Sequence, residues 1–181
     1  MRTRVLNRVM TLRRALCLFA IFASAVVLVI RAHAADTALQ VLLDTSKASP
    51  RAVEPLTERG ILRDYRFAWT SLTQALELST LDPLEGPFAG AAKQVLKDTV
   101  LSQQRSGLSR QYVNQNHRVE TVFYSPEGDV MELHDTAEFE LRISDGGKII
   151  HDDHVTMHYI VLMTPGADRW VVRQLQAVPK S

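Results

Sequence analysis

Cysteine is nearly absent from this chain of 181 residues, and its absence excludes two kinds of chemistry from most of it. The single cysteine, Cys17, lies in an apolar N-terminal run, and none follows residue 34. Residues 35–181 therefore contain no disulfide bond and no catalytic thiol. A domain without cysteine is also compatible with an oxidising compartment.

Basic charge is scarce outside the N-terminal segment. Six of the 21 Lys and Arg residues lie in residues 1–34, which contain no Asp or Glu. The other 15 stand against 20 acidic residues, so residues 35–181 carry a formal net charge of −5. Because phosphate backbones bind basic surfaces, this balance argues against nucleic acid as a partner. The sequence also lacks a Gly-rich phosphate loop and a Ser–His–Asp arrangement, and it predicts no cofactor.

The one long apolar run occupies residues 15–30 and follows Arg13 and Arg14. A basic flank, an apolar run and the closing Ala32-His33-Ala34 are typical of a secretory signal peptide cleaved before Ala35. An uncleaved membrane anchor is the alternative, since a spanning helix needs about 20 residues. In both cases the N-terminal arginines stay in the cytoplasm. The rest of the chain is then periplasmic or otherwise extracytoplasmic, either secreted or anchored in the cytoplasmic membrane.

Two long helices are predicted after a short helix and a linker in residues 35–55. Apolar residues at spacings of three and four predict the first long helix in residues 56–79 and the second in residues 88–106. Pro83 and Pro87 prevent a continuous helix, and Gly107 is a natural end for the second one. The apolar stripes consist of Leu62, Tyr65, Trp69, Leu72 and Leu76 in the first helix, and Phe88, Ala91, Ala92, Val95, Leu96 and Thr99 in the second.

The spacing of apolar residues changes to two after residue 107, which predicts strands. Four strands are expected in residues 112–125, 131–143, 154–164 and 169–178, joined by turns that contain Gly with Asp or Pro. Helices followed by meandering strands predict an α+β domain in residues 56–181, with the helices packed on a curved four-stranded antiparallel sheet.

The strand in residues 131–143 contains the most informative residue. Its odd positions are apolar except for Asp135, whereas its even positions include the acidic strip Glu132, Glu138 and Glu140. The strip is interpreted as a solvated face, with a homodimer surface as the alternative. A carboxylate among apolar neighbours is costly unless it is paired or protonated. Asp135 is therefore either a hydrogen-bonded core residue or a candidate for chemistry.

The order of these elements, with Trp170-Val171-Val172 in the last strand, resembles the nuclear transport factor 2-like superfamily. That resemblance implies a cone in which helices pack into a bent antiparallel sheet and leave a pocket. The pattern of Trp69 with Asp82-Pro83 and residues 88–92 is similar to the membrane-attached, non-catalytic branch. This branch includes the intermembrane-space domain of plastid division proteins and VirB-type secretion scaffolds. Enzymes of the same fold place an Asp or a His inside the cone, so the fold does not choose between these branches.

The register of the hairpin at residues 145–148 decides what Asp135 faces. A two-residue turn places Asp135 opposite His158, which gives an acid–base dyad in an apolar interior. A shift by one residue places Asp135 opposite Tyr159 and turns His158 to the charged face. Hydrophobic matching favours the shifted register, in which Asp135 is a structural carboxylate bonded to Tyr159 or Tyr124.

A histidine cluster resembles a metal site at first sight. His151, Asp152 and His154 lie close in sequence, and His154 and His158 have a spacing of four. On a strand, four residues span about 13 Å, which is too far for one ion. The cluster is interpreted as a solvated strand entry, and the sequence predicts no metal.

Aromatic side chains are the remaining candidates for a binding site. Tyr65, Trp69 and Tyr159, together with Trp170, are candidates for lining a ligand pocket, although aromatic residues at helical spacing are more often core. The sequence thus favours an exported or membrane-anchored binding or scaffold module without catalytic activity. Its partner is an unknown protein or small-molecule ligand. The alternative is a small isomerase-like or dehydratase-like enzyme that uses Asp135 and His158.

Overall fold

The computed structural model describes residues 39–178. The predicted signal peptide or anchor in residues 1–34 lies outside the described residues. Within residues 39–178, no helix is long and apolar enough to cross a membrane. Two α-helices and a six-stranded, mostly antiparallel sheet form a mixed α+β fold, which is the class that the order of elements predicted.

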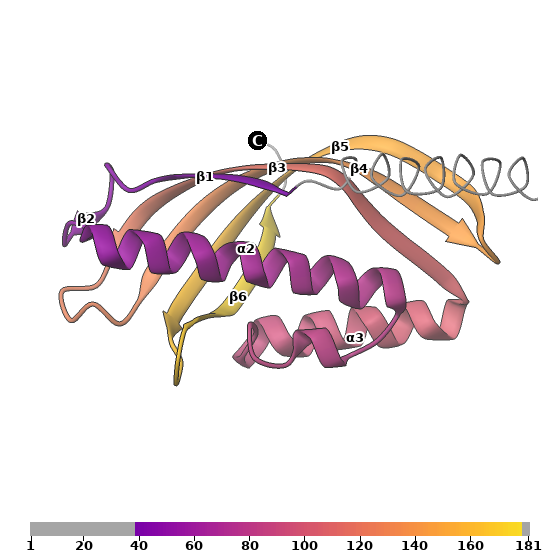
Figure 1. The fold of residues 1–181 in the computed structure, drawn as a ribbon, viewed down its shortest axis with the longest axis horizontal. Helices are drawn as coiled ribbons and strands as arrows, with labels where there is room; N and C mark the ends of the chain where they lie inside the picture. Colours follow the sequence, from indigo (N-terminus) through magenta and orange to yellow (C-terminus); the bar gives the residue numbers. More distant parts are fainter. Residues whose placement is uncertain (1–38, 179–181) are drawn as a thin grey trace, which may run out of the picture. The chain divides into compact units, whose positions relative to one another are not determined.

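Four antiparallel strands form most of the sheet, in the order of the chain (Figure 1). They are β3 (Leu108–Tyr124), β4 (Met131–Asp145), β5 (Lys148–Pro165) and β6 (Trp170–Val178). All four were predicted. β3 and β5 begin four and six residues earlier than expected, because the polar residues at their starts still pair with β4.

Two short strands correct the prediction of a four-stranded sheet. β1 (Gln40–Asp44) and β2 (Ser49–Pro50) pair in parallel with β3, so residues 40–44 form a strand and not the expected short helix. Leu39, Leu42 and Leu43 suggested a helical stripe, but alternation is what is observed, since Val41 is buried and Leu42 is 66% exposed. The free edge of β3 supplies hydrogen-bonding groups that a short isolated helix could not replace.

The two helices lie on the same face of the sheet (Figure 1). α2 (Pro55–Leu78) buries Tyr65, Trp69, Leu72 and Leu76, as its stripe predicted, whereas Leu62 of that stripe is only partly buried and Ile61 is buried instead. It ends where Ser79 adopts a left-handed conformation, and a single 3-10 turn, η1 (Asp82–Leu84), follows before the second helix. The core lies between α2, α3 and the inward face of the sheet.

The buried stripe of α3 (Gly90–Ser106) differs from the predicted one. Ala92, Leu96 and Val100 are buried, whereas Val95 is 57% exposed. The prediction took its helical phase from Phe88, but this residue precedes the helix. Residues 87–89 pair instead with β6, where the Ala89 N–H donates to the Val172 carbonyl at 2.9 Å. The helix therefore starts two residues later and in a different phase.

The hairpin between β4 and β5 combines both registers considered from the sequence. Asp145 opposes Lys148, as a two-residue turn requires. A bulge next to Ile143 and Ser144 then leaves Ile150 as an extra residue, which shifts the pairing by one. Beyond the bulge, Asp135 opposes Tyr159 and Thr136 opposes His158. The register that hydrophobic matching favoured is therefore the observed one.

Candidate functional site

Asp135 lies in the interior, on the face of β4 that the helices cover. It is 2% exposed, between Leu133 and Ala137, which are fully buried on the same face. The alternation along β4 places it there, because every odd residue from 131 to 139 points inward. A buried carboxylate needs partners, and two side chains from other elements supply them.

Two hydrogen bonds converge on one oxygen of Asp135. The Tyr65 hydroxyl on α2 donates to Asp135 Oδ2 at 2.7 Å. Nδ1 of His117, on β3, lies 2.7 Å from the same oxygen. His117 is fully buried, and within residues 39–178 neither its Nε2 nor Asp135 Oδ1 has a hydrogen-bond partner. Tyr65, His117 and Asp135 thus form one buried polar network, called the interior triad below.

Aromatic rings enclose the interior triad. The centre of the Trp69 ring lies 4.4 Å from the centre of the His117 ring, and the centre of the Tyr159 ring lies 5.3 Å from that of Trp69. Burial and the charge of Asp135 raise the pKa of Tyr65 well above its usual value. Burial also raises the pKa of Tyr159. Both phenols therefore remain protonated, and Tyr65 acts as a donor to the carboxylate.

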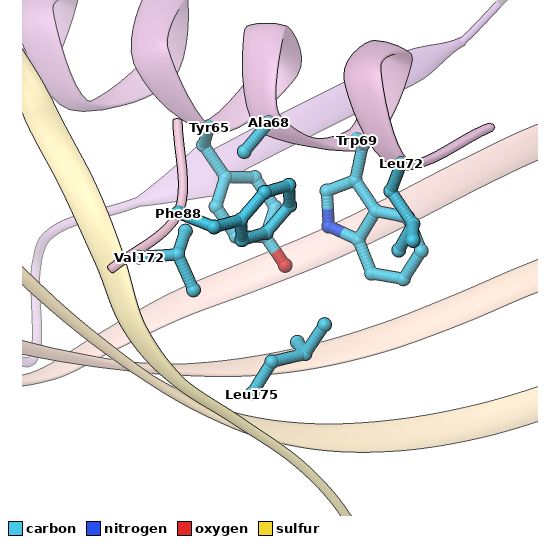
Figure 2. Close-up of a pocket in the computed structure, with 7 residues that line it drawn as sticks. All are labelled: Tyr65, Ala68, Trp69, Leu72, Phe88, Val172 and Leu175. Atoms are coloured by element: carbon cyan, nitrogen blue, oxygen red, sulfur yellow. The ribbon is translucent and has the colours of Figure 1, made fainter. Parts of the chain in front are cut away.

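The space beside the interior triad is too small for a substrate. Side chains of α2, Phe88 and β6 converge on a cavity with a volume of about 10 Å³ (Figure 2). That is about one water molecule at most. Its walls are formed by Tyr65, Ala68, Trp69, Leu72, Phe88, Val172 and Leu175. Tyr65 and Trp69 line this cavity, whereas Tyr159 and Trp170 are not among its wall residues, and a ligand-binding role for these side chains stays a prediction.

The alternative register, in which Asp135 and His158 form a dyad, is not the observed one. His158 lies on the opposite face of the sheet, where its Nδ1 is 3.1 Å from the Thr136 hydroxyl. The bulge at Ile150 causes this, because it shifts the register by one residue and so reverses the face that His158 occupies. The predicted bonds from Asp135 to Tyr159 or Tyr124 are replaced by those to Tyr65 and His117.

The sequence did not predict that His117 is buried, because this residue lies in a polar segment, Asn114-Gln115-Asn116-His117-Arg118. An irregularity between Val113 and Asn116, where Asn114 has a φ of 54°, resets the alternation of β3. The segment then continues with His117, Val119 and Thr121 on the inward face, all buried. Counting back in steps of two from Val119 would have placed His117 inside the domain.

The histidine cluster at the start of β5 lies at the surface. His151, Asp152 and His154 are exposed, and no group of three or more potential metal ligands occurs within residues 39–178. The carboxylates of Asp152 and Asp153 are paired with neighbouring side chains. Asp152 accepts from Arg142 at 3.3 Å, and Asp153 lies 3.1 Å from His151. The acidic strip is likewise at the surface and partly paired, since Glu138 binds Arg118 and Glu140 binds Arg142.

The surface itself is hollowed between the first half of α2 and the turn that joins β5 to β6. This groove has a volume of about 410 Å³, and it is open to solvent. Gly60 lies on its α2 side, and a Cβ added at this position would lie 3.9 Å from the Trp170 ring. Leu56 and Phe67 extend the same helix face and are 76% and 40% exposed. The groove is lined mainly by Leu56, Gly60, Arg63, Pro165, Arg169 and Trp170.

Buried Asp64 fixes the geometry of the groove. It is 3% exposed, and its Oδ2 accepts the backbone N–H of Trp170 at 2.8 Å, which attaches β6 to α2. Its two oxygens also accept from Arg63 at 2.8 and 3.0 Å, and this pairing raises the pKa of Arg63. Arg169 lies over the Phe67 ring at 4.9 Å. The Arg169 guanidinium is therefore held beside an apolar ring at this surface, while that of Arg63 is held by Asp64.

Comparison with known proteins gives a distant match of fold. No family model matches the chain, and no curated protein matches its sequence. Among solved structures, the chain is similar to the intermembrane-space region of the chloroplast protein ARC6, with a TM-score of 0.56 and 15% sequence identity. The match covers 72% of this chain and 100% of that chain. At this identity the likeness concerns the fold alone, and membership of the nuclear transport factor 2-like superfamily stays a prediction.

Proposed function

We propose that residues 39–178 form a non-catalytic module that binds another protein. The small volume of the cavity beside the interior triad is the observation that carries this proposal. The carboxylate that suggested chemistry is bonded to Tyr65 and His117, and the adjoining cavity has room for about one water molecule. A substrate or a carried small molecule needs roughly 300 Å³ or more. The interior triad therefore serves the core, and recognition takes place at the surface.

The groove beside Gly60 is the surface that fits this role. Trp170 and exposed Leu56 are among the residues that line it, and exposed Phe67 lies next to it on the same face of α2. Exposed apolar side chains around a hollow are typical of protein interaction sites. The absence of a side chain at Gly60 leaves space for one apolar side chain of a partner. The flanking Arg63 and Arg169 are already paired with Asp64 and Asp168, so the apolar walls of the groove, and not a free positive charge, define the partner segment as apolar.

The proposed location is outside the cytoplasm, with residues 1–34 acting as a cleaved signal peptide or as an anchor. Two observations support this location: the basic flank and apolar run of that segment, and the fold likeness to an intermembrane-space region. N-terminal sequencing of the mature protein is expected to start at Ala35 if the signal is cleaved. An intact N-terminus in a soluble cytoplasmic fraction would contradict export.

Site-specific photocrosslinking in cells tests the binding function. A photoreactive amino acid replaces Phe67, which is exposed next to the groove, and a matched control replaces Val95 on α3, which is also exposed. We expect one discrete protein adduct from position 67 and none from position 95. The substitution Gly60→Leu fills the groove, so it should abolish the adduct without lowering the melting temperature. Adducts of equal yield from both positions, or an adduct that survives Gly60→Leu, would contradict the proposal.

A further inference from the structure

Within residues 39–178, the outer half of β5 has one edge without a neighbouring strand. The described part of β6 pairs with β5 from His158 to Pro165, whereas β4 pairs with β5 along nearly its whole length. Within residues 39–178, no strand lies on the other side of residues 148–157. Figure 1 shows β5 continuing well past β6 towards the hairpin. Alternate backbone N–H and C=O groups point out of such an edge, so it is able to pair with a further strand.

The side chains of this edge are self-complementary. Residues 151–154 read His-Asp-Asp-His and are all exposed. When two copies of a strand pair antiparallel around a two-fold axis, side chains on the same face oppose each other. With the axis at Asp153, Asp152 of each copy opposes His154 of the other copy, which gives two Asp–His pairs. This register also provides His154 with an acidic partner, and within residues 39–178 it has none.

The neighbouring charges are compatible with this register. On the outward face, Asp152 is opposite Arg142 on β4 and His154 is opposite Glu140, and Arg142 binds both Asp152 and Glu140. On the inward face, Asp153 is opposite Leu141 and His151 is opposite Ile143. The two copies of Asp153 meet at the axis, but each lies 3.1 Å from His151 of its own chain. Protonated histidines thus offset the one like-charge contact.

We propose that two copies of this chain associate by antiparallel pairing of the open β5 edges, centred on Asp153. The contact is independent of the groove beside Gly60. One pair of strand edges is a small interface, so the association is weak and concentration-dependent. It strengthens as the pH falls from 8 towards 5.5, because histidine gains its charge in that range while carboxylates keep theirs.

Sedimentation of the full chain in mild detergent tests the association. At roughly 100 μM protein, a concentration that populates weak complexes, we expect dimers near pH 5.5 and monomers near pH 8. His154→Glu places like charges opposite each other and should weaken the dimer at least about tenfold. His134→Glu is the matched control, since His134 is also exposed on the outward face but lies on β4. A dimer that His154→Glu leaves unchanged, or a monomer at both pH values, would overturn the proposal.

A covalent readout tests the register itself. In a Cys17→Ser background, Asp153→Cys places two thiols opposite each other at the axis, within disulfide distance. Mild oxidation should give a disulfide-linked dimer, whereas the exposed control Val95→Cys should stay monomeric. Equal crosslinking of both variants, or of neither, contradicts pairing at Asp153.

Discussion

The most direct test of the interior concerns Asp135. The substitution Asp135→Leu removes the acceptor for two buried donors, the Tyr65 hydroxyl and His117 Nδ1. Each donor left unpaired costs about 1 to 3 kcal/mol, so the free energy of unfolding should fall by about 2 to 6 kcal/mol. That is a large share of the roughly 5 to 15 kcal/mol that stabilises a typical domain.

The isosteric substitution Asp135→Asn separates hydrogen bonding from charge. An amide oxygen accepts both donors as the carboxylate does, and only its NH₂ group is left without an acceptor. The expected loss is therefore about 1 to 3 kcal/mol, which is smaller than that of Asp135→Leu. His134→Leu, at an exposed neighbour on the same strand, is the control and should change stability by no more than about 0.5 kcal/mol.

Urea denaturation followed by tryptophan fluorescence measures these losses. Trp69 is a local probe, because its ring lies 4.4 Å from the His117 ring. Tyr65→Phe, alone and combined with Asp135→Leu, completes a double-mutant cycle. The two losses should be clearly less than additive, because each substitution removes the same hydrogen bond. If Asp135→Leu is as stable as the wild type, the interior triad does not hold the core together and the reasoning fails.

Two further predictions concern pH and backbone conformation. The pKa values of Tyr65 and Tyr159 are raised in the folded state. The contribution of these two phenols to the free energy of unfolding is therefore complete below about pH 10. Above that pH it is lost, by up to about 1.4 kcal/mol per pH unit for each phenol. Tyr65→Phe should make the decline in unfolding free energy between pH 10 and 12 visibly shallower; an unchanged slope would exclude this origin. Gly60→Ala should raise stability by about 0.5 to 1 kcal/mol, because Gly60 is helical and an added Cβ meets only Trp170 at 3.9 Å. Gly128→Ala should lower it by about 1 to 3 kcal/mol, because Gly128 has a φ of 77°, a conformation that is strained for a residue with a Cβ. Chemical denaturation should give changes of opposite sign for the two variants, and equal signs would contradict this account.

Periodicity was sufficient to predict the main elements but not the edges of the sheet. The stripe through Tyr65 and Trp69 and the alternation around Asp135 each repeat over many residues, so the buried face is well determined. β1 is only five residues long, and its leucines fit helical spacing as well as alternation. What decides between the two is the free edge of β3, which comes from residues about 75 positions later in the chain. A local pattern does not contain that information.

The interior triad shows a similar limit at the level of single side chains. The inward position of Asp135 follows from β4 alone, but its partners come from α2 and β3. Tyr65 was identified as a pocket residue from its place in the stripe, and its contact with Asp135 required the packing of α2 on the sheet. His117 required the irregularity at Asn114, where a residue with positive φ changes which side chains face inward.

The bulge at Ile150 gives the last prediction, since this one residue reconciles the turn with the core. The turn requires Asp145 opposite Lys148, while the core requires Tyr159 opposite Asp135, and the two pairings differ by one residue. Deletion of Ile150 satisfies both with a regular hairpin. Because Ile150 is 56% exposed, its removal should change the free energy of unfolding by less than about 1 kcal/mol. Deletion of Val161 is the control: it is fully buried where β5 lies between β4 and β6, so its loss displaces core residues and should prevent folding. Near-ultraviolet circular dichroism and urea midpoints distinguish the two variants. If the Ile150 deletion also loses the folded signal, the extra residue is required by the sheet itself, and hydrophobic matching alone does not set the register.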